Sequence, residues 1–215
     1  MLEDIKKVSE LALKGTTTVG VVFKSGVVLV ADKRVTSGRY VAHRTAEKIL
    51  KISDHMAVTI AGTVADAQNI VDILKANVNL YSFMYETKMS IKAAANLVSL
   101  ILFQNRNLPY LVQVIVAGID EAGPHIYVLD FFGNLTRENY CATGSGSMIA
   151  YGILEEGYRD NLTKEEAVKL CIRALSSAIK RDLATGDGID CIVIDETGFH
   201  KFTPDDIRRI MEATS

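Results

Sequence analysis

TTTVGVVFKSGVVLVADKR, residues 16–34, is the stretch of sequence that decides the fold. Its two β-branched, apolar runs, residues 18–23 and 27–31, are separated by Lys-Ser-Gly at residues 24–26, a pattern that predicts a β-hairpin. The runs are almost continuously apolar rather than alternating, and strands of that kind are covered on both faces. The hairpin is therefore expected in a sheet that is buried between two other layers.

Outward from this hairpin, groups of strands alternate with pairs of helices. The helices are indicated by apolar residues at three- and four-residue steps and by start signals such as the capping box that opens at Thr163. The expected strands are residues 49–52, 56–61, 112–119, 126–132, 135–142 and 189–195, and the expected helices are residues 64–86, 90–105, 148–158, 163–183 and one that starts at 203. This order predicts an α+β fold in which two antiparallel sheets pack together between layers of helices.

Composition excludes several classes of function. With 215 residues, 48% of them hydrophobic, the chain is expected to form one domain. Lys and Arg total 24 against 26 for Asp and Glu, and no basic block points to a nucleic acid or an anionic membrane as partner. The first fifteen residues carry too many charges for a signal sequence or a membrane span. We therefore expect a soluble, cytoplasmic protein.

Cysteine and histidine usage gives no sign of a metal centre. The three cysteines form no CxxC pair and lie in apolar stretches, as buried thiols do, which fits a reducing compartment. The four histidines lie too far apart in sequence to form a local set of ligands. No metal site and no cofactor are expected.

Thr16 is the candidate nucleophile. Taken alone, the threonines after Gly15 are typical of a strand that begins after a glycine turn. The alternative is that cleavage before Thr16 creates a hydroxyl and a free α-amine on one residue. Such an amine, with a pKa of roughly 7.7 to 8.0, can accept the hydroxyl proton near neutral pH. Gly15 lacks a Cβ, so it would let the hydroxyl approach the preceding carbonyl for self-cleavage.

Other polar or glycine positions are individually weak candidates. Asp32 ends a buried strand and needs a cation or hydrogen bonds, and Lys48 could supply that charge beside Thr16, although an exposed charged turn and a surface lysine are the commoner cases. The N–H of Gly62 could face an oxyanion, although a plain strand-end glycine is more usual. Ser145 stands where a serine often caps a helix.

Together these segments resemble the β-subunits of the 20S proteasome, of the archaeal type, which are N-terminal-nucleophile hydrolases. The segments that carry the resemblance, in the family's order and spacing, are TTTVG at 16–20, ADKR at 31–34, EKI at 47–49, AGTVADAQ at 61–68, GSGS at 144–147 and RDLATGDG at 181–188. The resemblance covers the chain after Gly15. It implies a four-layer α/β/β/α sandwich, with residues 1–15 a propeptide removed on maturation and residues 16–215 the hydrolase domain.

The resemblance also implies roles for single residues. Thr16 is expected to be the nucleophile of a threonine endopeptidase that frees itself by autocatalytic cleavage between Gly15 and Thr16. The other expected catalytic residues are Asp32 and Lys48 as charged partners, the Gly62 N–H as oxyanion donor, and Ser145, Asp182 and Thr185 as groups that orient the Thr16 amine. The family usually has serine where Thr185 stands, but the hydroxyl is kept.

Substrate and partners follow from the same resemblance. Thr36 and the backbone of residues 62–64 are expected to bind an extended peptide as an added strand. The first specificity pocket is expected to be lined by Val35, Ala46, Ile60 and Val64. None of these four carries a charge, so cleavage after hydrophobic residues is expected. The chain would assemble in a homo- or hetero-heptameric β-ring between two proteasome α-subunit rings, with an ATPase cap that feeds unfolded polypeptides into the closed chamber.

Two other functions remain open. A non-catalytic β-type subunit would shape the ring without maturing, although the intact Gly15–Thr16 junction and the retained Asp32 and Lys48 argue against it. The second is an N-terminal-nucleophile amidase acting on small molecules, or a relative of the bacterial ATP-dependent peptidase. The match over residues 181–188 and the expected C-terminal helix make this second function less favoured.

Overall fold

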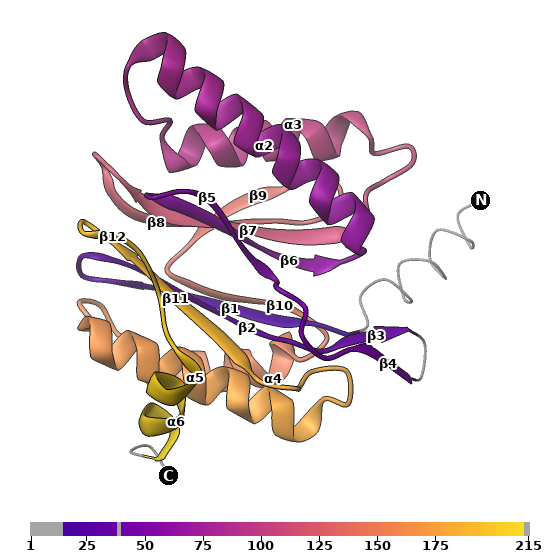
Figure 1. Cartoon of the computed structure of the whole chain (residues 1–215), viewed down its shortest axis with the longest axis vertical. Coiled ribbons are helices and arrows are strands. Elements are labelled where there is room, and N and C mark those ends of the chain that lie inside the picture. Colours follow the sequence, from indigo (N-terminus) through magenta and orange to yellow (C-terminus); the bar gives the residue numbers. More distant parts are fainter. Residues whose placement is uncertain (1–14, 38–39, 213–215) are drawn as a thin grey trace.

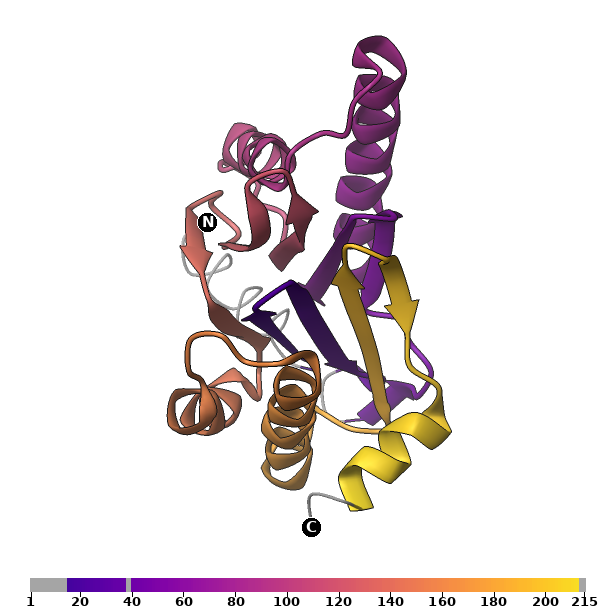
Figure 2. The same cartoon turned by 90° about the vertical axis from the view of Figure 1, so that its left-hand side faces the viewer.

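The computed structural model describes residues 15–37 and 40–212, and these form four layers (Figure 1). Two five-stranded antiparallel sheets lie face to face, and each carries a pair of helices on its outer side. The perpendicular view in Figure 2 shows the same two helix pairs on either side of the sheets. The α+β sandwich with two packed sheets is therefore confirmed. The expected propeptide, apart from Gly15, lies outside the described residues.

The first sheet is built around the hairpin that the opening stretch predicts. In spatial order its strands are β10 (Tyr140–Gly144), β1 (Thr17–Phe23), β2 (Gly26–Asp32), β11 (Ile189–Asp195) and β12 (Gly198–Lys201). β1 and β2 pair from Thr18 opposite Ala31 to Phe23 opposite Gly26, so the turn consists of the two residues between them. Every residue of β2 is buried, as its continuous apolar run predicts.

The second sheet contains the strands from the middle of the chain. In spatial order they are β5 (Ile49–Ser53), β6 (Met56–Gly62), β7 (Val112–Asp120), β8 (Gly123–Leu129) and β9 (Leu135–Glu138). A separate two-stranded ribbon, β3 (Val35–Ser37) and β4 (Tyr40–His43), follows β2. This ribbon extends from the end of the sandwich at which β2 finishes (Figure 1).

The helices cover the two outer faces. α2 (Val64–Tyr85) and α3 (Ile91–Gln104) lie on the second sheet, whereas α4 (Ser147–Gly157) and α5 (Lys164–Arg181) lie on the first, with α6 (Pro204–Glu212) beside α5. The capping box predicted at Thr163 is present, because its side chain accepts from the Glu166 N–H while the Glu166 side chain accepts from the Thr163 N–H. The helix after it is α5.

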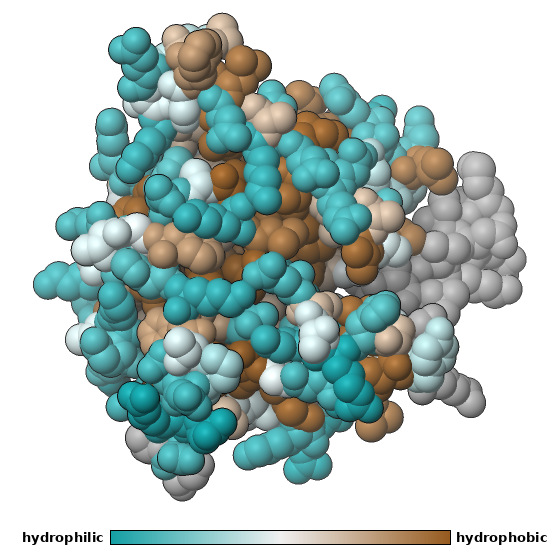
Figure 3. All heavy atoms as spheres, in the orientation of Figure 1, coloured by the Kyte–Doolittle hydropathy of each residue, from teal (hydrophilic) through white to brown (hydrophobic). Residues whose placement is uncertain are grey.

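Three apolar cores separate the four layers, and β2 contributes to two of them. Val27, Leu29 and Ala31 point into the core between the sheets, whereas Val28 and Val30 point into the core beneath α4 and α5. A third core lies between the second sheet and the α2–α3 pair. The apolar run of β2 is unbroken because successive strand residues face opposite sides, and each side of β2 faces a core. Hydrophilic residues predominate on the face that Figure 3 shows.

One expected strand is wrong as a single element. Residues 135–142 form two strands in different sheets, since β9 pairs with β8 and β10 pairs with β1. The break is at Asn139, whose carbonyl oxygen accepts from the N–H of Val22 (2.8 Å) where the chain passes between the sheets. Both halves have strand-forming residues, so periodicity alone does not detect the crossing. The short strands β3, β4 and β12 were not predicted, because none of their described residues is fully buried and they give no apolar run.

The three cysteines, Cys141, Cys171 and Cys191, are free and buried, as their apolar surroundings predict. Burial raises the pKa of each thiol well above its ordinary value.

Among the described residues, no helix is both long enough and apolar enough to cross a membrane.

Replacing Leu29 tests the core between the sheets. Leu29 has no exposed surface, so Leu29→Ala should lower the free energy of unfolding by about 2–5 kcal/mol, through lost burial and the cavity left behind. Leu80→Ala is the matched control, because Leu80 is 55% exposed and should change stability by roughly 0.5 kcal/mol or less. Denaturant unfolding of the isolated chain measures both, and equal losses would contradict the assignment of Leu29 to a packed core.

Candidate active site

The Gly15–Thr16 peptide lies immediately before β1, against Thr36 of β3. Gly15 has a φ of +120°, and a Cβ on it would lie 2.3 Å from Thr36 Oγ1, so only glycine fits here. The Thr16 hydroxyl donates to the Gly15 carbonyl oxygen at 2.7 Å. The hydroxyl that sequence analysis selected as nucleophile is thus turned back toward the carbonyl group that precedes it.

A buried ion pair faces the same carbonyl group. Lys48 Nζ lies 2.7 Å from Asp32 Oδ1, and the side chains are only 6% and 0% exposed. Lys48 Nζ also donates to the carbonyl oxygens of Gly15 (3.2 Å) and Arg34 (2.5 Å). Burial lowers the pKa of Lys48, and the attraction of Asp32 opposes that shift. The commoner interpretations, an exposed charged turn and a surface lysine, are wrong for this pair.

Backbone donors surround the rest of the Asp32 carboxylate. Oδ1 accepts from the N–H of Thr17 (2.9 Å), and Oδ2 accepts from the N–H groups of Gly186 (2.9 Å) and Arg34 (3.1 Å). A carboxylate buried at the end of a strand requires such partners, because burying an unpaired charge is costly. Asp32 therefore ties together the start of β1, the end of β2 and the loop after α5.

Ser145, Asp182 and Thr185 meet beside Thr16. Asp182 Oδ2 accepts from Ser145 Oγ and from Thr185 Oγ1, both at 2.5 Å. The Ser145 N–H donates to the Thr16 carbonyl oxygen at 2.8 Å. The expectation that Ser145 caps a helix is wrong: α4 has Gly146 at its N-cap position and no side-chain cap, because the serine hydroxyl is directed to Asp182.

Thr17 is a residue that sequence analysis missed. It is fully buried, donates its N–H to Asp32, and places its hydroxyl 2.7 Å from Thr185 Oγ1. The same hydroxyl oxygen accepts from the N–H of Gly146 at 3.0 Å. Three threonines in a row are typical of a strand, so the sequence gives no separate sign that the side chain of Thr17 joins two parts of the site.

A pair of arginines was also missed. Arg34 Nε and Arg44 Nη1 each lie 2.8 Å from the Asp187 carboxylate, and Arg34 also donates to the Leu183 carbonyl oxygen at 2.7 Å. The hydrogen bond to Asp187 raises the pKa of Arg34. These contacts hold the loop after α5 against the end of β2. Nothing in the local sequence links Arg44 to Asp187, which lie 143 residues apart.

Gly62 and the expected substrate residues occupy neighbouring segments. Gly62 ends β6 with a φ of +141°, and a Cβ there would lie 2.0 Å from the Leu111 carbonyl oxygen. The Ile60 N–H donates to the Lys48 carbonyl oxygen at 3.1 Å, so this end of β6 lies beside Lys48. Thr36 lies against Gly15. The role of Gly62 as oxyanion donor stays a prediction.

The four expected pocket residues come from four different segments of the chain. Val35 is in β3, Ala46 precedes Lys48 by two residues, Ile60 is buried in β6, and Val64 is the first residue of α2 and 56% exposed. Their joint role in specificity stays a prediction.

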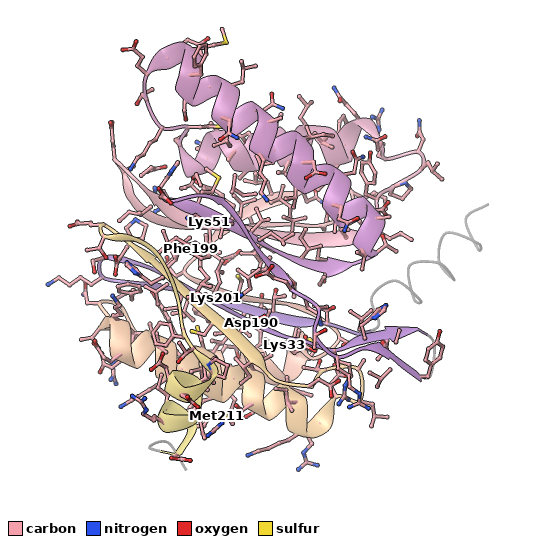
Figure 4. The ribbon with its side chains drawn as sticks, viewed as in Figure 1. Lys33, Lys51, Asp190, Phe199, Lys201 and Met211 are labelled. Carbon is pink, nitrogen blue, oxygen red and sulfur yellow. The ribbon has the colours of Figure 1, made fainter. Side chains whose placement is uncertain are left out.

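A cavity of about 220 Å³ lies elsewhere, along the open edge between β5 and β12. Figure 4 shows Lys51, Phe199, Lys201 and Asp190 along this edge, with Lys33 nearby. Lys33 Nζ pairs with Asp190 at 3.0 Å. None of the expected catalytic or substrate-binding residues lines this cavity. Within residues 15–37 and 40–212, no group of three or more His, Cys, Asp or Glu side chains is placed to hold a metal ion.

Comparison with known proteins identifies the family. The family described as proteasome subunit matches residues 12–194. The chain belongs to the proteasome subunit family. It is 46% identical over 205 residues to proteasome subunit beta 2 of Nitrosopumilus maritimus, a match that covers 95% of this chain and 98% of that protein. It is 47% identical to proteasome subunit beta of Ferroglobus placidus, with the same coverage, and 45% identical to proteasome subunit beta of Archaeoglobus fulgidus, covering 95% of this chain and 96% of that protein.

The resemblance to archaeal β-subunits drawn from short motifs is thereby confirmed over most of the chain. The structure of this proteasome subunit brings Asp32, Lys48, Ser145, Asp182 and Thr185 together around Thr16 and Thr17. The added methyl group of Thr185 does not prevent its hydroxyl from reaching Asp182.

Separating the buried charges tests the ion pair of this proteasome subunit. Asp32→Asn leaves the Lys48 ammonium without a counter-charge and should lower the free energy of unfolding by about 3–5 kcal/mol. Adding Lys48→Met to Asp32→Asn should restore part of that loss, because no uncompensated charge remains buried. Denaturant unfolding of the two single variants and the double variant measures the coupling. Strictly additive losses would show that the two side chains do not stabilise each other.

Proposed function

We propose that this chain is a catalytic β-subunit of a 20S proteasome core and acts as a threonine endopeptidase after it loses residues 1–15. The observation that carries the proposal is the convergence of two groups on one carbonyl. The Thr16 hydroxyl (2.7 Å) and the Lys48 ammonium (3.2 Å) both contact the Gly15 oxygen, at the peptide bond expected to be cleaved. Family membership supports the same function.

Cleavage of the leader begins with attack of Thr16 Oγ1 on the Gly15 carbonyl carbon. The Lys48 ammonium stabilises the negative charge that develops on the Gly15 oxygen, because it already donates to that atom. The C–N bond then breaks, the hydroxyl proton passes to the Thr16 nitrogen, and an ester joins Gly15 to Thr16. Water hydrolyses the ester, which releases the leader as a carboxylate and leaves Thr16 with a free amine.

Substrate peptides are cleaved by the same nucleophile. The free amine accepts the Thr16 hydroxyl proton while the oxygen attacks the substrate carbonyl, and the departing amine receives a proton as the ester forms. Water then releases the second product. Lys48 supplies positive charge beside the oxygen, which lowers the pKa of the hydroxyl, and the Gly62 N–H is the proposed oxyanion donor. Ser145, Asp182 and Thr185 orient the amine.

The proposed setting is a closed chamber in the cytoplasm. Heptameric β-rings, of this chain alone or with a second β-type, lie between two α-subunit rings, and an ATPase cap delivers unfolded polypeptides. An extended peptide binds as an added strand along Thr36 and the backbone of residues 62–64, which gives affinity through main-chain hydrogen bonds. Because the nucleophile has little intrinsic selectivity, enclosure in the chamber would restrict cleavage to polypeptides that can enter it.

Replacing the nucleophile tests the proposed chemistry. Thr16→Ala removes the attacking oxygen, so assembled particles should retain residues 1–15 in every subunit and hydrolyse no peptide above background. Thr16→Ser keeps the oxygen and is the matched control, which should mature and remain active. Mass spectrometry of the particles and turnover of fluorogenic peptides measure both properties. Retention of the leader in every wild-type subunit would instead favour the non-catalytic role, and hydrolysis of small amides but no peptide would favour the amidase.

Cleavage preference tests the expected pocket. Because Val35, Ala46, Ile60 and Val64 are uncharged, kcat/KM should be higher for fluorogenic peptides with a large apolar residue before the cleaved bond than for otherwise identical peptides with an acidic residue there. A Thr16→Ala particle measured in parallel corrects for contaminating peptidases. Faster cleavage after acidic residues would overturn the assignment of these four residues.

A further inference from the structure

Thr17 lies between two groups of residues that the proposed reaction uses. Its N–H donates to Asp32 Oδ1 at 2.9 Å, and its hydroxyl lies 2.7 Å from Thr185 Oγ1. The residue has no exposed surface, so its hydroxyl depends on protein partners to satisfy it. Because Thr17 is bonded directly to Thr16, both contacts act within one residue of the nucleophile.

The hydroxyl contacts have a fixed direction. Thr185 donates its single hydroxyl hydrogen to the Asp182 carboxylate at 2.5 Å, so its oxygen accepts the hydrogen of Thr17. The Thr17 oxygen in turn accepts from the Gly146 N–H at 3.0 Å. Hydrogen bonds therefore run one way, from Gly146 through Thr17 and Thr185 to Asp182.

Glycine at position 146 makes this arrangement possible. A Cβ on Gly146 would lie 2.4 Å from Thr17 Oγ1 and 2.9 Å from the Cβ of Ala178. No side chain fits between the backbone and the threonine hydroxyl at these distances. The hydroxyl of Thr17 thus lies between the N-terminus of α4 and the loop after α5.

We propose that Thr17 is a positioning residue that fixes Asp182, and with it Ser145, relative to Thr16. The inference rests on the proposed function, in which the freed Thr16 amine is the base. Ser145 donates to the same oxygen of Asp182, and its hydroxyl oxygen lies 3.4 Å from the Thr16 carbonyl oxygen. A displacement of Asp182 would therefore move Ser145 relative to Thr16. Thr17 also ties this group to the Asp32–Lys48 ion pair through its own N–H.

A variant of matched shape tests the role of the hydroxyl. Thr17→Val, in the full chain assembled into particles, should lower kcat about tenfold per processed subunit and leave KM within about twofold, because only alignment in the transition state is affected. The acid limb of the pH profile of kcat/KM should also move to lower pH. An Asp182 carboxylate that is held less firmly stabilises the protonated Thr16 amine less, so the amine loses its proton at a lower pH. Thr17→Ser keeps the hydroxyl and should restore most of kcat and the wild-type limb.

Thr18→Val is the matched control for loss of a buried hydroxyl. The Thr18 hydroxyl contacts Thr59 (2.9 Å) and Thr143 (2.7 Å) and makes no contact with Asp182. Both valine variants should lose thermal stability, but only Thr17→Val should move the acid limb. Should Thr17→Val fail to assemble, the smaller Thr17→Ala gives the same comparison.

The outcomes separate this inference from the proposed function. A Thr17 variant whose kcat and pH profile match those of Thr18→Val would overturn the positioning role and reduce Thr17 to a buried strand residue. If Thr16→Ala is inactive in the same assay, the proposed function stands although this inference fails. If Thr16→Ala particles remain active, the proposed function fails as well.

Discussion

The buried ion pair between Lys48 and Asp32 is the constraint on which the rest of the site depends. Removing two charges from water costs several kcal/mol per ion, so such a pair persists only where other polar groups complete its surroundings. Here those groups belong to the backbone: the N–H groups of Thr17, Arg34 and Gly186 surround Asp32. Three separate segments must therefore meet at the end of β2, and the same meeting places Thr16 beside the ammonium group.

The sandwich supplies this meeting point because its central strands are buried on both faces. β2 packs into the core between the sheets and into the core beneath α4 and α5, so its end cannot shift without disturbing two cores. Its neighbours β1 and β11 bring Thr17 and the loop after α5 to that end. Gly144 completes the arrangement, because a Cβ on it would lie 1.9 Å from the Thr16 carbonyl oxygen.

The sequence predicted these features to different degrees. The β1–β2 hairpin and the capping box at Thr163 were predictable because local pattern determines them. The break at Asn139 and the Arg44–Asp187 contact were not, because each depends on how distant segments pack. The pairing of Asp32 with Lys48 followed from a motif resemblance rather than from either residue alone. Thr17 was missed because a β-prone threonine has the same local signal whether or not its hydroxyl serves a site.

The donors of Lys48 link the two proposed reactions. An ammonium group has three N–H donors, and in the uncleaved chain Lys48 contacts three oxygens, those of Gly15, Asp32 and Arg34. Loss of residues 1–15 removes the Gly15 oxygen but neither of the others, so one donor is released. The Thr16 hydroxyl oxygen lies 2.7 Å from the departing Gly15 oxygen. In the proposed reactions, the charge that assists removal of the leader would then act on the nucleophile itself, so a single buried lysine would serve both steps.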